Sequence, residues 1–242
     1  MYYLHENCAC TRCGSPTVYV DKERVWRTCP QMLIMQFESV FLQLACSLAV
    51  AEVELQFEHR DLHCGNVLVN TTQQEFAEFL LRGRRVQVGT VGVKASVIDF
   101  SLSRTLIGEQ VCFTDLSGDS AFFEGTGSVQ HEIYRTMKEQ NSGDWEAYRP
   151  HTNVLWLHYL LTKLLKKLPK TKQVADVVEP STPRGRLAAW EDVILSFSSA
   201  EEFVAQQVIP HLERDAEAPR RARRVQRPQT EEPRAMNLRT SR

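Results

Sequence analysis

Polar side chains suited to phosphate chemistry are concentrated in FEHRDLHCGNVLV, which runs from Phe57 to Val69 between two apolar segments. Within this stretch, Asp61 and Asn66 lie five residues apart in the pattern H-R-D-x-x-x-x-N. In phosphoryl transfer a carboxylate accepts the proton of the attacking hydroxyl, and an amide oxygen binds Mg²⁺, which prefers hard oxygen ligands. The pattern therefore predicts a catalytic Asp61 and a metal-binding Asn66.

This chemistry needs a second metal ligand, and VIDFSLSR (Val97 to Arg104) offers Asp99 after three apolar-leaning positions. The arrangement fits a D-F-G element in which Ser101 stands where glycine is usual. Two matched elements in this order are far more specific than either alone, and the alternative is a chance pairing of unrelated residues. We expect Asn66 and Asp99 to bind Mg²⁺ together.

Several segments of the chain resemble haspin, a family of atypical eukaryotic protein kinases. The segments are SLAVAE, FEHRDLHCGNVLV, IDFSLSR, NVLWLHYL and LSFSSAEE, and the resemblance covers roughly residues 32–209. It implies a protein-kinase fold, ATP and Mg²⁺ as cofactors, and phosphorylation of a threonine near the N-terminus of histone H3 in mitosis. The partners implied are the histone H3 tail and chromatin, and the location implied is the nucleus, on chromosomes.

The resemblance also implies roles for individual residues in the site. Asp61 would be the catalytic aspartate, and Asn66 and Asp99 would bind the metal ions that accompany ATP. His63 occupies the position of a lysine that lies near the transferred phosphate in ordinary kinases, and the alternative is a hydrogen-bonded loop histidine. His59 and Arg60 are expected to brace the loop.

The adenine-binding hinge of a kinase would fall at Met35 to Glu38, so that Phe37 and Glu38 are the expected contacts to the nucleotide. No G-x-G-x-x-G precedes the catalytic loop, and Lys22 does not have the V-A-I-K setting of the strand lysine. We therefore expect the N-terminal lobe to be largely absent and catalysis by this chain alone to be weak or nil. The alternatives are a non-catalytic interaction module and a small-molecule phosphotransferase.

The predicted fold is mainly α with small β elements (α+β), like the C-terminal lobe of a protein kinase. Residues 1–31 are predicted to be irregular, 32–212 to form the large lobe, and 213–242 to be a basic, disordered tail. The predicted strands are Met32 to Glu38, Asn66 to Val69 and segments within Arg84 to Phe100. The predicted helices are Ser39 to Phe57 with Ser39 as N-cap, Glu132 to Gln140, Thr152 to Leu168, Leu187 to Phe197, and Ser199 to Leu212.

The composition of the chain is that of a globular protein. The 242 residues are 43% hydrophobic and 24% charged with a formal net charge of −1, which is ordinary for a globular protein. We find no apolar run of membrane-spanning length and no signal peptide, so we expect an intracellular protein without a membrane partner. Direct DNA contact is expected only through PRRARRVQR in the tail, which could also be a nuclear import signal or a solvated basic segment.

Cysteines and acidic residues suggest two further sites. Seven cysteines are expected to be free thiols, and a zinc site built on Cys8, Cys10, Cys13 and Cys29 lacks a convincing second ligand pair. Because a histone tail is basic, its groove should be acidic, and the alternative is a solvated loop. Ala121 and Ser128 stand where the family tends to place acids. The candidate acids for the groove are Asp115, Asp119, Glu124 and Glu132.

Overall fold

The computed structural model describes residues 30–168, 179 and 181–225, and its central element is α1 (Pro30–Leu55). This 26-residue helix spans about 39 Å at 1.5 Å per residue. Its apolar residues cover most of its circumference, and Phe41, Ala45 and Ala49 are fully buried. A helix that is apolar nearly all round belongs in the core of a protein or in a membrane.

Both possibilities apply to α1 by composition, because Met32–Leu55 is long and apolar enough to cross a bilayer. This finding corrects the expectation that the chain has no apolar run of that length. In the structure, 83% of the apolar window is buried inside the fold. The apolar side chains of α1 therefore form the protein core.

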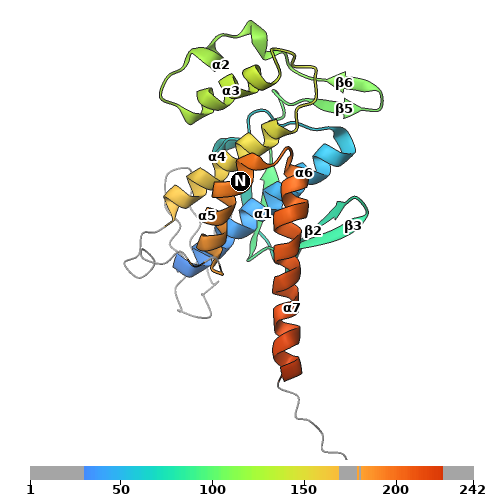
Figure 1. Cartoon of the computed structure of the whole chain (residues 1–242), viewed down its shortest axis with the longest axis vertical. Helices are drawn as coiled ribbons and strands as arrows, with labels where there is room; N and C mark the ends of the chain where they lie inside the picture. The colour runs from blue at the N-terminus through green and yellow to red at the C-terminus, as the bar shows by residue number, and fades with distance from the viewer. Residues whose placement is uncertain (1–29, 169–178, 180, 226–242) are drawn as a thin grey trace, which may run out of the picture.

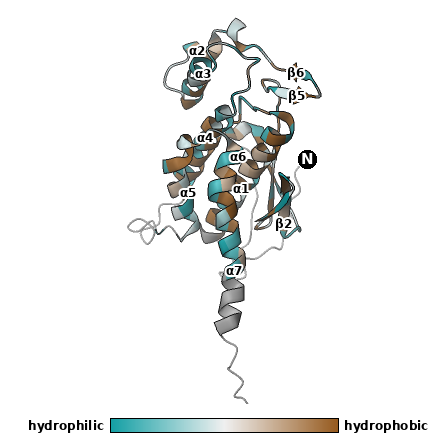
Figure 2. Ribbon diagram, turned by 45° about the vertical axis from the view of Figure 1, so that its right-hand side comes forward, coloured by the Kyte–Doolittle hydropathy of each residue, from teal (hydrophilic) through white to brown (hydrophobic). Residues whose placement is uncertain are grey.

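The helices that follow pack around α1 (Figure 1). Those in direct contact with it are α4 (His151–Lys167), α5 (Pro183–Val193) and α6 (Ala200–Phe203). A π-helical turn, Val204–Val208, leads into α7 (Ile209–Val225), which projects from one end of the molecule (Figure 1). Figure 2 shows apolar residues on α1 and α4 in the middle of the molecule.

In the described part of the chain, six short strands form three antiparallel pairs. β1 (Val67–Thr71) pairs with β4 (Val93–Val97), and β2 (Phe76–Leu81) pairs with β3 (Arg84–Gly89). The third pair joins β5 (Thr105–Ile107) to β6 (Gln110–Cys112). The third pair lies near α2 (Ala121–Glu124) and α3 (Val129–Gln140) at the end of the molecule opposite α7 (Figure 1).

Buried polar residues of α1 fix the strands against the helix. Ser39 Oγ donates to the carbonyl of Gly89 at 2.6 Å, and Gln43 Nε2 donates to the carbonyl of Val93 at 3.0 Å. Gln43 Oε1 accepts the backbone N–H of Ala95 at 3.0 Å, so this one side chain contacts β4 twice. These bonds set the position of β4, whose end carries the predicted metal ligand.

The structure confirms the α+β class and most of the predicted helices and strands. The predicted strand at Met32 to Glu38 is wrong, because these residues form the first turns of α1. Ser39 is therefore an interior residue of the helix and not its N-cap. A short apolar run has no periodicity that separates a strand from a buried helix, and here it continues a longer apolar helix.

The C-terminal boundary also differs from the prediction. Helix α7 continues to Val225, so at least the first 13 residues of the predicted disordered tail, 213–225, are helical. Residues 226–242 and the four candidate zinc ligands before Pro30 lie outside the described residues. The predicted domain limits otherwise remain a prediction.

Candidate active site

The segment between α1 and β1 is held at both ends by the backbone. After α1 ends at Leu55, the chain turns at Gln56, whose φ of 45° is left-handed. Glu58 then forms a two-way backbone bridge with Arg104, with N–H to O distances of 2.9 Å in both directions. At the other end, the Asn66 carbonyl accepts the N–H of Ile98 at 3.0 Å, so the catalytic motif lies in a loop whose two ends are fixed.

Asp61 and Asn66 are in direct contact, as their spacing predicts. Asn66 Nδ2 donates to the backbone carbonyl of Asp61 at 2.9 Å and lies 3.4 Å from Asp61 Oδ2. The buried Asn66 ends a short 3-10 turn, Cys64–Asn66. Because its NH₂ group is engaged with Asp61, its carbonyl oxygen is left to face a ligand.

Asp99 lies at the same end of the β1–β4 pair as Asn66. Val67 is paired with Val97, and Ile98 donates its N–H to the Asn66 carbonyl at 3.0 Å, which places Asp99 one residue further on. Asp99 has a left-handed φ of 61°, a strained geometry of the kind that is found at functional sites. The loop thus turns sharply at the predicted metal ligand.

The charge on Asp99 is maintained by a neighbouring side chain. Ser101 donates to Asp99 Oδ1 from its hydroxyl at 2.7 Å and from its backbone N–H at 3.3 Å. These hydrogen bonds lower the pKa of the Asp99 carboxyl below its ordinary value. Serine in place of the usual glycine therefore supports the ionised aspartate.

The donor set fits Mg²⁺ bound together with a nucleotide. Asn66 and Asp99 supply hard oxygen donors, and Mg²⁺ is usually held by one or two carboxylates together with substrate phosphates. Within the part of the chain that the structure describes, no group of three His, Cys, Asp or Glu residues forms a metal cage. The site therefore suits a metal that arrives with phosphate ligands of its own.

His63 is oriented toward Asp61 by the backbone of its own loop. Its Nδ1 accepts the N–H of Gly65 at 2.9 Å, and its Nε2 lies 3.7 Å from Asp61 Oδ2. A Cβ at Gly65 would lie 2.7 Å from His63 Cε1, so a side chain at this position would displace the His63 ring from its place beside Asp61. The structure shows the loop hydrogen bond of His63, and its expected position near the transferred phosphate stays a prediction.

His59 connects the catalytic loop to the metal-binding loop. Its ring is fully buried, its Nδ1 accepts the N–H of Asp61 at 3.3 Å, and its Nε2 contacts the carbonyl of Ile98 at 3.1 Å. Burial lowers the pKa of His59, so the ring is neutral at pH 7 and donates from Nε2 to Ile98. This pattern matches the bracing role expected for His59.

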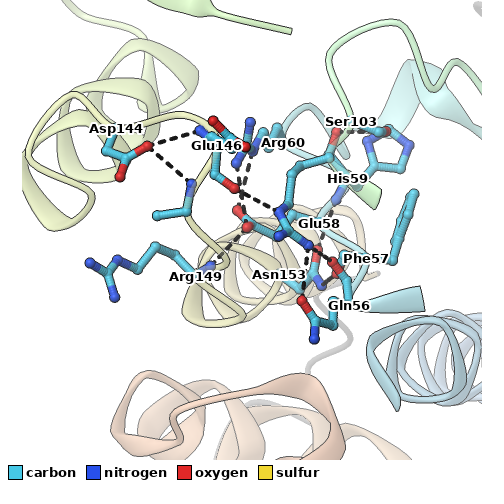
Figure 3. A network of polar contacts seen from close by, with 12 residues as sticks. Gln56, Phe57, Glu58, His59, Arg60, Ser103, Asp144, Glu146, Arg149 and Asn153 are labelled. Atoms are coloured by element: carbon cyan, nitrogen blue, oxygen red, sulfur yellow. Dashed lines mark hydrogen bonds and ion pairs between the residues drawn. The ribbon is translucent and has the colours of Figure 1, made fainter. Parts of the chain in front are cut away.

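The positive charge of Arg60 is balanced by an ion pair within the loop. Its guanidinium is 1% exposed, its Nε donates to Glu58 Oε2 at 3.2 Å, and it lies 5.5 Å from the centre of the Trp145 ring. Glu58 Oε1 also accepts the backbone N–H of Arg149 at 2.8 Å, as Figure 3 shows. Arg60 therefore joins the loop to the segment before α4.

Comparison with known proteins places this geometry in a family. The model of the haspin-like kinase domain matches residues 32–180. The mouse serine/threonine-protein kinase haspin is 41% identical over 169 residues, and the Arabidopsis thaliana haspin homologue is 45% identical over 130. The chain belongs to the haspin-like kinase domain family. These matches cover 70% and 53% of the chain but only 22% of each relative, so the chain spans about a fifth of their length.

Sequence reasoning missed Asn153, which anchors the haspin-like catalytic loop from α4. Its Oδ1 accepts the N–H of His59 at 3.0 Å, and its Nδ2 donates to the carbonyl of Phe57 at 2.8 Å. The same Nδ2 donates to Glu52 Oε1 at 2.9 Å. Asn153 opens NVLWLHYL, one of the segments that resemble haspin, but its role is not visible there because it lies 94 positions after His59, which it binds.

Glu52 extends this anchor to a third element. Its carboxylate accepts the N–H groups of Ala200 at 3.0 Å and Glu201 at 2.8 Å, at the start of α6. Burial raises the pKa of Glu52 to about 7, and hydrogen bonds from Asn153 and the two amides offset part of that increase. The same helix is capped by Ser199, whose Oγ accepts the N–H of Glu202 at 3.0 Å.

Phe37 and Glu38 are not brought to this site. Both side chains are buried on the N-terminal half of α1, whereas the catalytic loop follows its C-terminal end. Glu38 is bound by Arg186, with Nε to Oε1 and Nη2 to Oε2 distances of 2.5 and 2.8 Å. The hinge prediction depended on a strand at residues 35–38, and the helix that forms there places Phe37 and Glu38 in the core.

The four acidic candidates for a peptide groove are exposed, and two of them have local bonds. Asp115 accepts the N–H of Ser117 at 2.8 Å, which lowers its pKa, and Asp119 accepts that of Ala121 at 2.9 Å. Each acid keeps a second carboxylate oxygen that the structure does not assign to a partner among the described residues. All four lie between β6 and the middle of α3: Asp115, Asp119, Glu124 and Glu132.

Proposed function

We propose that this chain carries the phosphotransfer site of a haspin-type serine/threonine kinase, which moves the γ-phosphate of ATP to a threonine of the histone H3 tail. The observation that carries the proposal is the position of Asn66. Its side chain contacts Asp61, and its backbone carbonyl binds the residue before Asp99. A base and two oxygen ligands therefore lie at one end of the β1–β4 pair.

The chemistry assigned to these residues follows from phosphoryl transfer. The substrate hydroxyl oxygen forms a bond to the γ-phosphorus, the bond from that phosphorus to the leaving ADP breaks, and the hydroxyl proton passes to Asp61. Bound Mg²⁺ supplies positive charge that neutralises the phosphates, and Asn66 and Asp99 would hold it. The neutral, buried His59 keeps the two loops in register without adding charge to the site.

A histone tail is proposed as the substrate because its charge complements that of the exposed acidic residues and because the chain belongs to the haspin-like family. The acidic residues between β6 and α3 are exposed, and they follow the metal-binding loop in the chain. Opposite charges steer a basic peptide toward a site and fix its register. Chromatin as a partner, a role in mitosis, and a nuclear, chromosomal location are part of the same proposal.

A non-catalytic module that binds chromatin is the second candidate. It is favoured by Glu38 and Phe37, the expected nucleotide contacts, which are buried in the core. Membership in the haspin-like family counts against a small-molecule phosphotransferase.

The test is phosphate transfer from ATP to a histone H3 tail peptide, with a second peptide in which alanine replaces the threonine. We expect weak transfer at most, confined to the threonine peptide and abolished by Asp61→Asn. Labelling that persists in Asp61→Asn would contradict the role of Asp61. Robust turnover would contradict the expectation of weak activity, and no transfer together with no Mg-ATP binding would support the module.

A further inference from the structure

A tyrosine on α3 binds the carboxylate of the predicted catalytic base. Tyr134 donates its hydroxyl to Asp61 Oδ1 at 2.6 Å, although 73 residues separate the two in the chain. Tyr134 is only 6% exposed, whereas the Asp61 side chain is 18% exposed and can be reached from solvent. A distance of 2.6 Å is typical of a hydroxyl bound to a carboxylate, which is among the stronger hydrogen bonds in proteins.

The two oxygens of Asp61 consequently have different surroundings. Oδ1 carries the short bond to Tyr134, while the contacts of Oδ2 with the described residues are longer, 3.4 Å to Asn66 Nδ2 and 3.7 Å to His63 Nε2. A carboxylate fixed through one oxygen does not rotate freely about its Cβ–Cγ bond. The oxygen with the weaker contacts is the one left to accept a proton.

Tyr134 itself is held by packing and keeps its proton. Its ring centre lies 5.0 Å from that of Phe122 and 5.7 Å from that of Trp156. Burial raises the pKa of the Tyr134 phenol, and the hydrogen bond to Asp61 raises it further. The phenol is therefore protonated at neutral pH and donates its proton to the hydrogen bond with Asp61.

The tyrosine also belongs to the segment that carries the acidic residues. The next residue, Arg135, donates to the carbonyls of Phe123 and Gly125 at 3.0 and 2.9 Å, which binds the end of α2 to α3. The α2–α3 unit is therefore in hydrogen-bond contact with Asp61 through Tyr134.

We propose that Tyr134 is a positioning residue, which fixes the Asp61 carboxylate with Oδ2 toward the substrate and couples it to the α2–α3 unit. The proposal rests on the proposed function for the role of Asp61 as the base. Tyr134 acts through Asp61 and makes no contact with the reacting phosphate in this account. Its variants are therefore expected to change the rate of the chemical step more than the binding of peptide.

The first test is a double-mutant cycle in thermal unfolding, which needs no catalysis. Tyr134→Phe keeps the ring and removes the hydroxyl, so we expect it to lower Tm by about 2–4 °C in the wild-type background. In an Asp61→Ala background the hydroxyl has lost its acceptor, and the same change should shift Tm by less than about 1 °C. Equal shifts in the two backgrounds would overturn the proposal.

The matched control is Tyr159→Phe. Tyr159 is equally buried at 6% and packs on the same Trp156, with ring centres 5.6 Å apart, and no hydrogen bond from its hydroxyl to Asp61 is found among the described residues. We expect Tyr159→Phe to shift Tm by the same amount in both backgrounds. If Asp61→Ala does not fold, Asp61→Asn serves as the second background. In that background we still expect Tyr134→Phe to shift Tm by less than it does in wild type.

A spectroscopic readout separates positioning from packing. With ¹³C-labelled aspartate, the Asp61 carboxyl signal is assigned by its loss in Asp61→Asn. We expect this signal to move in Tyr134→Phe and to stay in place in Tyr159→Phe, and an unmoved signal in Tyr134→Phe would contradict the inference. Where transfer to the peptide is measurable, Tyr134→Phe should lower kcat about tenfold with KM within about twofold, roughly the loss of one charged hydrogen bond.

The two proposals fail in different ways. A chain that transfers no phosphate but shows the coupled Tm shifts and the moved Asp61 signal would refute the proposed function and leave the contact in place. A chain with Asp61-dependent transfer but no coupling would refute the role of Tyr134 alone.

Discussion

At the scale of single residues, the catalytic loop depends on a buried ion pair. Glu58 and Arg60 are both 1% exposed, and Glu58 accepts bonds from Arg60 and from the backbone of Arg149. Burial lowers the pKa of Arg60, and Glu58 acts in the opposite direction. Removing one partner of such a pair leaves a buried charge without compensation.

We therefore predict that Glu58→Gln lowers the free energy of unfolding by about 3 kcal/mol, because it removes the buried negative charge beside Arg60. Chemical denaturation monitored by tryptophan fluorescence would measure this change. The control is Glu54→Gln, an exposed position on α1, for which we expect a change within about 0.5 kcal/mol. Similar small effects for both variants would show that the pair is not important for stability.

At the scale of elements, contacts between distant segments decide what the sequence could predict. Asp61, Asn66 and Asp99 were predictable because their local spacing and the strand before Asp99 are visible in the chain. Asn153 and Tyr134 were not, since each reaches the catalytic loop from a helix that is 73 or more residues away.

Element types were predictable wherever the pattern was long. The leucines of α4 recur with helical period over 17 residues, and the structure forms that helix. The seven apolar-rich residues 32–38 are too few to distinguish a strand from a helix, and only packing against the later helices makes them part of α1.

The link between α1, α4 and α6 makes stability depend on pH through Glu52. The pKa of Glu52 rises from the ordinary glutamate value of 4.5 to about 7 in the fold, because burial disfavours the charged form. The folded state therefore binds this proton more tightly than the unfolded chain does. The protonated Glu52 therefore makes its full contribution to the stability of the fold below about pH 4.5, and this contribution is lost as the pH rises to about 7.

Because the pKa of Glu52 is raised in the fold, part of the stability that wild type loses between pH 4.5 and 7 comes from this residue. We predict that Glu52→Gln removes that part, which is about 3 kcal/mol at most. The measurement is the free energy of unfolding of both proteins at several pH values in that window. Glu54→Gln should keep the wild-type pH dependence, because Glu54 is exposed. An unchanged pH dependence in Glu52→Gln would show that another group is responsible.

At the scale of the whole molecule, one central helix sets the geometry of the site. α1 ends where the catalytic loop begins, and it contacts α4, α5 and α6. Its Ser39 binds the end of β3, and its Gln43 binds the start of β4. The α2–α3 unit lies at the same end of the molecule as the β5–β6 pair (Figure 1). The site therefore lies between a rigid helical core and a smaller peripheral unit.

In the proposed function, Asn66 and Asp99 hold Mg²⁺ with a nucleotide beside Asp61. The most direct test is the change in Tm with ATP and Mg²⁺ together, compared with each alone, in wild type, in Asp99→Asn and in the exposed control Asp115→Asn. We predict a rise of about 4 °C at roughly ten times Kd in wild type and the control, and none in Asp99→Asn. No rise in wild type, or an equal rise in Asp99→Asn, would contradict the claim.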